Sequence, residues 1–233
     1  MAQRSVKSIF MFVTKSISSI SSPIIKVLFL GLLVSVHWQC NRMVPIDDIE
    51  QAPEVSEADQ AYANVYKSLD GHWKGQFFVF EAKELTERDD AILYNLKREL
   101  IQQDRLNIVN TLVVDQFYES ESPFFQKVKI MDFYEDKGET EVSLGVNKVQ
   151  DGKMWCVVRK PNETVIHEGS KEGESTIIWK RNEQNPQRVE YFKETVLPNT
   201  YEIVGWGYYE GDDQSKMPKT WFYAQYHRAP DDQ

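Results

Sequence analysis

The segment TEVSLGVNKV, residues 140–149, carries the clearest structural signal in this chain. Aliphatic side chains stand at every second position, namely Val142, Leu144 and Val146. Polar side chains take positions between them, namely Glu141, Ser143 and Asn147. Because successive side chains of a β-strand point to opposite faces, this period of two predicts a strand with one apolar face and one polar face.

The same alternation and regular turn signals continue around this segment. In QRVEYFKETV, residues 187–196, two apolar positions oppose three charged ones: Val189 and Tyr191 against Arg188, Glu190 and Glu194. Turn-forming residues cluster near 121–123, 136–138, 151–152, 161–162, 169–173, 182–186, 198–199 and 211–218. Segments of strand length between such turns indicate an antiparallel meander of eight or nine strands. We expect this sheet to close into a barrel, because closure leaves no unpaired edge.

Helical patterns interrupt the strands twice. Residues 86–105 carry apolar side chains at a spacing of three to four, after a capping pair at Thr86 and Asp89. A shorter helix is predicted at about residues 56–69, and the aromatic segment HWKGQFFVFEAK, residues 72–83, follows it as the first strand. The predicted fold is therefore mainly β, a single antiparallel β-barrel with one or two peripheral helices.

The first 39 residues have the charge bias of an export signal. They contain four cationic side chains, Arg4, Lys7, Lys15 and Lys26, and no acidic residue. The apolar run VLFLGLLVSV, residues 27–36, is long enough for the hydrophobic region of a signal and short for a membrane-spanning helix. We therefore expect residues 1–39 to be a signal segment, with Met11 as an alternative start.

Cys40 follows this run, in the arrangement on which bacterial lipoprotein processing acts. In that processing the thiol is acylated and the chain is cut before it, so that acyl chains hold the product on the membrane. The sequence VHWQC is bulkier before the cysteine than a typical lipobox. Lipidation of Cys40 predicts a cell-envelope protein anchored to a bacterial membrane. An uncleaved anchor, or an exported protein cut elsewhere, is the alternative.

The remaining chain divides into a tether and one acidic domain. Residues 40–60 are polar, acidic and interrupted by Pro45 and Pro53, which is typical of a flexible tether. Residues 61–230 then form the barrel domain. Without residues 1–39, Lys plus Arg falls from 27 to 23 while Asp plus Glu stays at 36, which leaves a net charge near −13. A phosphate backbone would repel such a surface, so we expect no nucleic-acid partner.

Few residues indicate catalysis. Cys156 lies in the apolar segment KMWCVV, which favours a buried, inert thiol over a reactive nucleophile. The chain has no CxxC, HExxH, P-loop or GxSxG motif. His72, His167 and His227 lie on different segments without the spacing of metal ligands, so we expect neither a metal site nor a cofactor. Whether the protein is an enzyme stays open at this point.

Aromatic residues are dense in the last two predicted strands, residues 200–210 and 219–229. They either fill the core and cover a helix, or line a cavity for a flat apolar ligand. On the second interpretation the ligand-binding residues are two arginines, which would meet charged groups, and five aromatic residues. These are Arg159, Arg188, Tyr191, Trp206, Tyr208, Trp221 and Tyr223.

The tripeptide Gly71, His72, Trp73 at the start of the first strand resembles the GxW motif that opens lipocalins and related calycins. In that family the tryptophan closes the bottom of the barrel, and an arginine from the last strand often packs over it. The resemblance implies a calycin-like barrel in which Trp73 and Arg228 form a structural cation–π closure.

A second stretch, VVDQFYESESPFFQKVKIMDFY at residues 113–134, resembles the CpcT/CpeT group of bilin lyases, which are calycin-like barrels. The matching positions are Asp115, Gln116, Pro123, Phe125, Gln126, Lys127 and Val128, with Trp221 matching later in the chain. Lys127 stands where that group has arginine, and Gly205, Trp206 and Gly207 stand where it has Asp-Arg-Gly. The resemblance implies the fold and a tetrapyrrole-sized pocket, but not lyase activity.

Three functional hypotheses follow. The first is a membrane-anchored lipoprotein that binds a hydrophobic or tetrapyrrole-like small molecule inside its barrel. The second is a CpcT/CpeT-like chromophore lyase in which Arg159 or Arg188 steers the propionates of the substrate. The third is a noncatalytic envelope scaffold whose aromatic outer face binds another protein. None of them predicts an oligomeric state.

Overall fold

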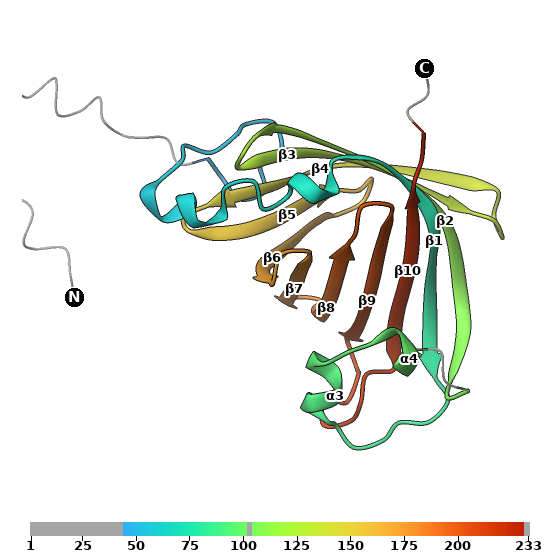
Figure 1. The fold of residues 1–233 in the computed structure, drawn as a ribbon. Coiled ribbons are helices and arrows are strands. Elements are labelled where there is room, and N and C mark those ends of the chain that lie inside the picture. The colour runs from blue at the N-terminus through green and yellow to red at the C-terminus, as the bar shows by residue number, and fades with distance from the viewer. Residues whose placement is uncertain (1–43, 102–103, 231–233) are drawn as a thin grey trace, which may run out of the picture. The chain divides into compact units, whose positions relative to one another are not determined.

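Antiparallel strands pair in chain order, and the first strand also pairs with the last, so the sheet closes into a barrel (Figure 1). The computed structural model of the protein describes residues 44–101 and 104–230. The ten strands in this part of the chain are β1 (Gly71–Ala82), β2 (Leu106–Ser122), β3 (Phe125–Tyr134), β4 (Glu139–Gln150), β5 (Lys153–Arg159), β6 (Thr164–Glu172), β7 (Thr176–Gln184), β8 (Gln187–Val196), β9 (Thr200–Tyr209) and β10 (Thr220–Arg228). A mainly β fold with a single closed antiparallel barrel confirms the predicted fold class.

The eight connections from β2 to β10 fall at the predicted turn signals. The connection between β4 and β5 is the pair Asp151 and Gly152, whose φ angles are 56° and 70°. Positive φ at both central residues is the geometry of a type I′ hairpin turn, in which Asp-Gly is a favoured pair. Nine strands therefore follow residue 105, and β1 brings the total to ten.

The long helix predicted over residues 86–105 is wrong. Two short helices form instead, α3 (Asp90–Tyr94) and α4 (Arg98–Ile101). The Asp89 carboxylate caps α3 by accepting hydrogen bonds from the backbone N–H groups of the first turn. At the other end, the Asn95 amide donates to the Ala91 carbonyl at 2.9 Å, which competes with the backbone and ends the helix. No helix in the described ranges is long and apolar enough to cross a membrane.

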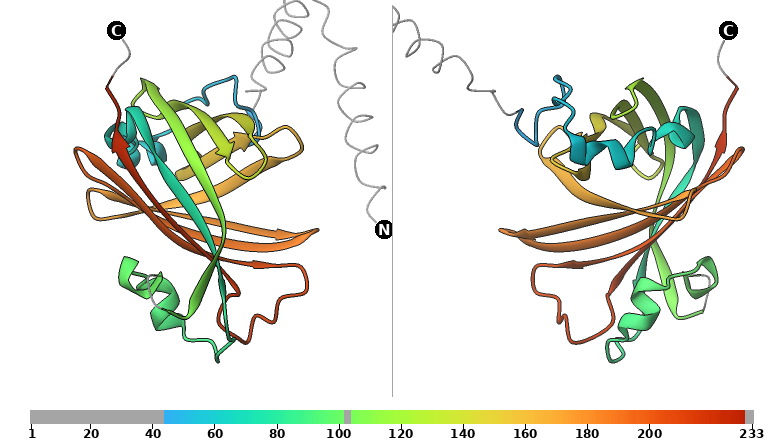
Figure 2. Two further views of the ribbon diagram at one scale, coloured as in Figure 1. Left: turned by 90° about the vertical axis from the view of Figure 1, so that its right-hand side faces the viewer. Right: turned by 60° about the vertical axis from the view of Figure 1, so that its left-hand side comes forward.

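These two helices lie against the outside of β8, β9 and β10 (Figure 2). Leu93, Leu96 and Ile101 are almost fully buried there. The indole Nε1 of Trp206 on β9 donates to the Leu93 carbonyl at 3.1 Å. The apolar spacing that suggested one helix therefore serves a different purpose, which is to cover an aromatic outer wall.

The end of the barrel where β1 begins is closed by Trp73. The helix predicted at 56–69 is present as two 3-10 helices, η1 (Glu57–Tyr62) and η2 (Lys67–Leu69), which lead into β1. Trp73 is fully buried and donates from Nε1 to the Leu69 carbonyl at 2.7 Å. The Arg228 guanidinium lies 4.3 Å from the centre of its ring and donates to the Asp70 and Pro198 carbonyls. This is the contact that the calycin resemblance implied.

Residues 44–49, in the segment expected to be a tether, lie against the outer wall of the barrel. The buried Lys148 side chain donates to the Pro45 and Asp48 carbonyls at 3.1 and 2.8 Å. Burial lowers the pKa of Lys148, and nearby aspartates oppose this. Ile49 packs beside Val146 in a small apolar cluster. The predicted signal segment and Cys40 lie outside the described residues.

We predict that Trp73→Ala lowers the free energy of unfolding by about 3–5 kcal/mol, because it leaves a large void at the closed end of the barrel. Urea denaturation followed by circular dichroism measures this loss. The matched control is Ile108→Ala on β2, which is 60% exposed and should change stability by less than about 0.5 kcal/mol. A loss below about 1 kcal/mol for Trp73→Ala would show that the closure does not depend on this residue.

Candidate functional site

A cavity of about 320 Å³ lies inside the barrel and is lined by side chains from all ten strands. This volume is at the lower end of the range, roughly 300 to 1,000 Å³, in which proteins hold small organic ligands. Nine aromatic side chains form much of the lining: Phe77, Tyr118, Tyr134, Trp179, Phe192, Tyr201, Tyr209, Phe222 and Tyr226. The barrel interior therefore offers a cavity with large apolar surfaces.

In β4 the polar face points into the barrel and the apolar face points outward, which is opposite to the usual arrangement. Ser143 and Asn147 point into the cavity, whereas Val142 and Leu144 are 48% and 53% exposed on the outside. The period of two was predicted correctly, but it does not say which face turns inward. Because the polar face of β4 turns inward, the interior carries polar groups that a plain apolar core would lack.

Strand β8 shows the same inversion. Its charged side chains Arg188, Glu190 and Glu194 line the cavity. Tyr191 points outward and stacks on Trp206, with ring centres 5.4 Å apart, beneath α3. The outer face of β8 can be apolar because α3 and α4 cover it.

Glu194 is the most perturbed carboxylate of the cavity. Burial raises its pKa from 4.5 to about 7, while hydrogen bonds from Trp179 and Tyr201 oppose the shift. Among the residues that the structure describes, none forms an ion pair with Glu194. The group therefore changes charge near neutral pH without a cation beside it.

A second carboxylate, Asp132 on β3, also faces the cavity. Burial raises its pKa, and the neighbouring Glu141 adds to this effect, while Lys160 opposes it. A layer of tyrosines lies close to both carboxylates: the Tyr201 and Tyr226 rings are 5.2 Å apart, and the Tyr118 hydroxyl donates to Gln116 at 2.8 Å. Burial raises the pKa of all three tyrosines well above 10, so these hydroxyls stay protonated.

Another set of charges lies where β8 begins and β9 ends. The Arg181 guanidinium forms ion pairs with Glu163 at 3.2 Å, Glu183 at 2.9 Å and Glu190 at 3.5 Å. Arg188 forms a further pair with Glu163 at 3.1 Å. Burial alone would raise the pKa of Glu190, but the neighbouring His167 and Tyr209, with the Arg181 charge, lower it. In this network two arginines are paired with three glutamates, whereas Glu194 has no ion-pair partner among the described residues.

Four polar atoms of the cavity lining are buried without a hydrogen-bond partner in the described part of the chain: Ser143 Oγ, Asn147 Oδ1, His167 Nε2 and Arg188 Nε. Such atoms are costly in a protein interior unless another molecule satisfies them. Ser143 and Asn147 are 1% and 2% exposed. The cavity lining therefore carries buried polar atoms as well as aromatic surfaces.

Cys156 also lines the cavity, between Asn147 and His167 on the neighbouring strands. Burial raises the pKa of its thiol, and the charge of Glu194 adds to the shift. The thiol is therefore protonated at neutral pH, whereas a catalytic cysteine needs a depressed pKa. Cys156 is partly buried, and its raised pKa favours the predicted inert thiol over a reactive nucleophile.

The five aromatic residues predicted to bind a ligand lie outside this cavity. Tyr191, Trp206, Tyr208, Trp221 and Tyr223 form one cluster with Leu93, Leu96 and Ile101, on the outer wall beneath α3 and α4. Gly205 and Gly207 occupy the inward positions of β9, so the aromatic residues beside them point outward. Of the two interpretations, the structure shows the one in which these rings cover a helix.

The two predicted arginines are on opposite sides of the barrel wall. Arg188 lines the cavity. Arg159 is half exposed on the outside, and its guanidinium lies 3.9 Å from the Glu50 carboxylate. The structure therefore does not bring these two arginines together to bind one ligand.

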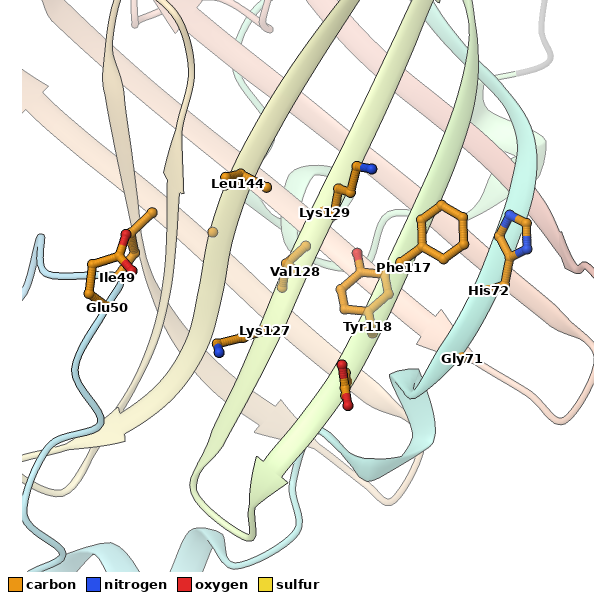
Figure 3. A pocket seen from close by; sticks show the side chains of 12 residues that line it. Ile49, Glu50, Gly71, His72, Phe117, Tyr118, Lys127, Val128, Lys129 and Leu144 are labelled. Atoms are coloured by element: carbon orange, nitrogen blue, oxygen red, sulfur yellow. The ribbon is translucent and has the colours of Figure 1, made fainter. Parts of the chain in front are cut away.

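A second concave surface of about 670 Å³ lies on the outer side of β1 to β4, beside Ile49 and Glu50 (Figure 3). His72 stacks on Phe117 there, with ring centres 4.0 Å apart, and its Nε2 lies 2.5 Å from Asp115. Lys127 pairs with Glu121 at 2.5 Å. His72 and Lys127 therefore already have partners within the protein.

The sequence interpretation did not select Glu194, Asp132, Trp179 or Asn147. The alternation in residues 187–196 did place Glu194 on one face with Arg188 and Glu190, which is the signal that leads to it. Nothing local indicated that this charged face turns inward. Among the described residues, no group of three or more His, Cys, Asp and Glu side chains is placed to hold a metal ion.

No protein-family model matches this chain, and no curated protein matches its sequence.

We predict that stability falls with rising pH because of Glu194. Since the folded protein binds this proton more tightly than the unfolded chain, the stabilisation is complete below the ordinary pKa of 4.5 and is lost as the pH rises through about 7. Glu194→Gln should remove this loss and should be more stable than the wild type by roughly 2 kcal/mol at about pH 8.

Urea denaturation at about pH 5 and about pH 8 measures the effect. Glu174→Gln, in the exposed turn between β6 and β7, is the control and should follow the wild type at both values. The explanation fails if Glu194→Gln and the wild type have parallel stability profiles.

Proposed function

We propose that this protein binds a small, largely apolar molecule with polar groups inside its barrel. The observation that carries the proposal is the cavity of about 320 Å³ inside the barrel, whose aromatic lining includes buried polar atoms without partners among the described residues. An apolar body would cover the aromatic rings, and its polar groups would satisfy atoms such as Ser143 Oγ and Asn147 Oδ1. Trp73 closes one end of the barrel, which would be the bottom of this binding site.

The cavity supports binding better than catalysis. Cys156 is a protonated thiol, and Arg181 and Arg188 are already paired with glutamates. What these groups supply is orientation of a ligand rather than an activated nucleophile. The lyase hypothesis used Arg159 or Arg188; Arg159 lies on the outside of the wall, and Arg188 is paired with Glu163.

The cavity volume also indicates the size of the ligand. A volume at the lower end of the ligand-pocket range favours a compact molecule of one or two rings. A tetrapyrrole-like ligand, the larger member of the predicted class, would need the strands to separate. We therefore favour the smaller, hydrophobic member of that class.

We predict that a neutral, apolar fluorescent probe, N-phenyl-1-naphthylamine, binds inside the barrel and gains fluorescence. Val165→Phe, which places a ring in the cavity, should weaken this binding by roughly tenfold or more. Val142→Phe is the matched control, because Val142 is 48% exposed on the outer wall. It should leave the affinity unchanged.

Native mass spectrometry of the purified protein provides a second readout, since a tightly held small molecule would appear as an added mass. Circular dichroism verifies that both variants keep the sheet. If the probe does not bind, or if the inner and outer variants bind it equally well, the cavity is not the binding site.

We also propose that Cys40 carries a lipid that anchors the protein to a bacterial membrane, in the cell envelope. The support is the cationic segment before it and the apolar run VLFLGLLVSV. Radiolabelled palmitate should be incorporated into the wild type and not into Cys40→Ser. Incorporation that survives this substitution would exclude the anchor. Cys156→Ser is the matched control and should retain the label.

A further inference from the structure

The part of the cavity around Glu194 offers hydrogen-bond acceptors. The Glu194 carboxylate receives hydrogen bonds from Trp179 and Tyr201. Two carboxylate oxygens have about four acceptor positions, so capacity remains for a further donor. The ion pairs of the described residues do not include Glu194, which sets it apart from Glu163 and Glu190 in the same cavity.

The Asn147 side chain provides a second hydrogen-bond acceptor. Its neighbours determine which end of its amide is the oxygen. Gln126 donates from its amide nitrogen to the Tyr66 carbonyl and to Asp70, so its oxygen is turned toward Asn147. Asn147 must then donate its amide nitrogen to Gln126, at 2.8 Å. The remaining atom, Oδ1, is buried without a partner among the described residues and can only accept a hydrogen bond.

Cys156 is the cross-strand partner of Asn147, so these two side chains are neighbours in the cavity that Glu194 also lines. Rings of Trp179, Tyr118 and Tyr201 line the same cavity. Aromatic faces attract cations, as in the aromatic cages that bind organic ammonium groups.

The charges of the whole cavity favour the same kind of ligand. Four carboxylates line it, Asp132, Glu163, Glu190 and Glu194, against three cations, Lys160, Arg181 and Arg188. The two arginines are paired with glutamates. The acceptor atoms near Glu194 therefore match a ligand that brings both N–H donors and a positive charge.

We propose that the ligand of this cavity is an organic amine, with an aromatic or alkyl body against the rings and a protonated nitrogen paired with the Glu194 carboxylate. The proposal rests on the proposed binding function and names the class of ligand. It makes Glu194 the residue that distinguishes an amine from a neutral molecule of equal size.

The test compares tryptamine with indole-3-ethanol, which differ only in an ammonium group and a hydroxyl group. Isothermal titration at about pH 8 should give the wild type at least a tenfold higher affinity for tryptamine. Glu194→Gln should lower the tryptamine affinity at least about tenfold and leave indole-3-ethanol within roughly threefold. This variant keeps the shape of the side chain and removes its charge, so it should fold.

Asp132→Asn is the matched control, because it neutralises another carboxylate of the same cavity. It should leave the preference for tryptamine in place. If Asp132→Asn removes the preference and Glu194→Gln does not, the assignment to Glu194 is overturned.

A pH series supplies a readout that a merely structural role would not change. The titratable groups around Glu194 are Tyr118, Tyr201, Tyr226, Cys156 and Asp132. The tyrosines and the thiol stay neutral near pH 7, which leaves the two carboxylates, and Asp132→Asn separates the titration of Asp132 from that of Glu194. Tryptamine affinity should rise by roughly tenfold between about pH 5.5 and about pH 8 in the wild type. It should rise far less in Glu194→Gln.

The outcomes separate the two proposals. If tryptamine, indole-3-ethanol and the neutral fluorescent probe all fail to bind, the proposed binding function falls. If the neutral molecules bind in the cavity but tryptamine shows no preference in the wild type, only the amine proposal falls. Preference that depends on Glu194 and on pH supports both.

Discussion

Pairing of β1 with β10 is the constraint on which the rest of this structure depends. Once the ten strands close, every second side chain must enter a shared interior, whatever its polarity. Trp73 fills one end of this interior, and Arg228 packs over it from the neighbouring strand. The remaining space is surrounded by the ten strands, so most groups that line it must find partners inside the barrel.

On the side of β8 to β10, the polar interior is possible because the outer wall is covered. An apolar outer face would normally be costly in water, but α3 and α4 bury the aromatic cluster around Trp206. On another side, Ile49 covers Val146. Where these segments cover the outer wall, apolar side chains are shielded from water even though they point outward. Carboxylates such as Glu194 can then occupy the inner positions of the strands.

The interior combines two kinds of charge with different roles. Around Arg181, three glutamates and a cation stabilise one another, as buried charges usually require. Glu194 has hydrogen-bond donors beside it but no ion-pair partner in the described part of the chain, and its pKa of about 7 reflects that imbalance. A network of paired charges is suited to holding the barrel in shape, whereas a carboxylate without an ion-pair partner is suited to recognising a cation from outside.

The sequence by itself determined the strands, their order and their turns, because period-two alternation and pairs such as Asp151 and Gly152 act through local backbone geometry. It also indicated the contact of Trp73 with Arg228, through a resemblance. Tertiary structure decided which face turns inward: Glu194 and Asn147 face the cavity, and Tyr191 faces a helix. Alternation has two equivalent directions, and only the segments packed on the outer wall choose between them.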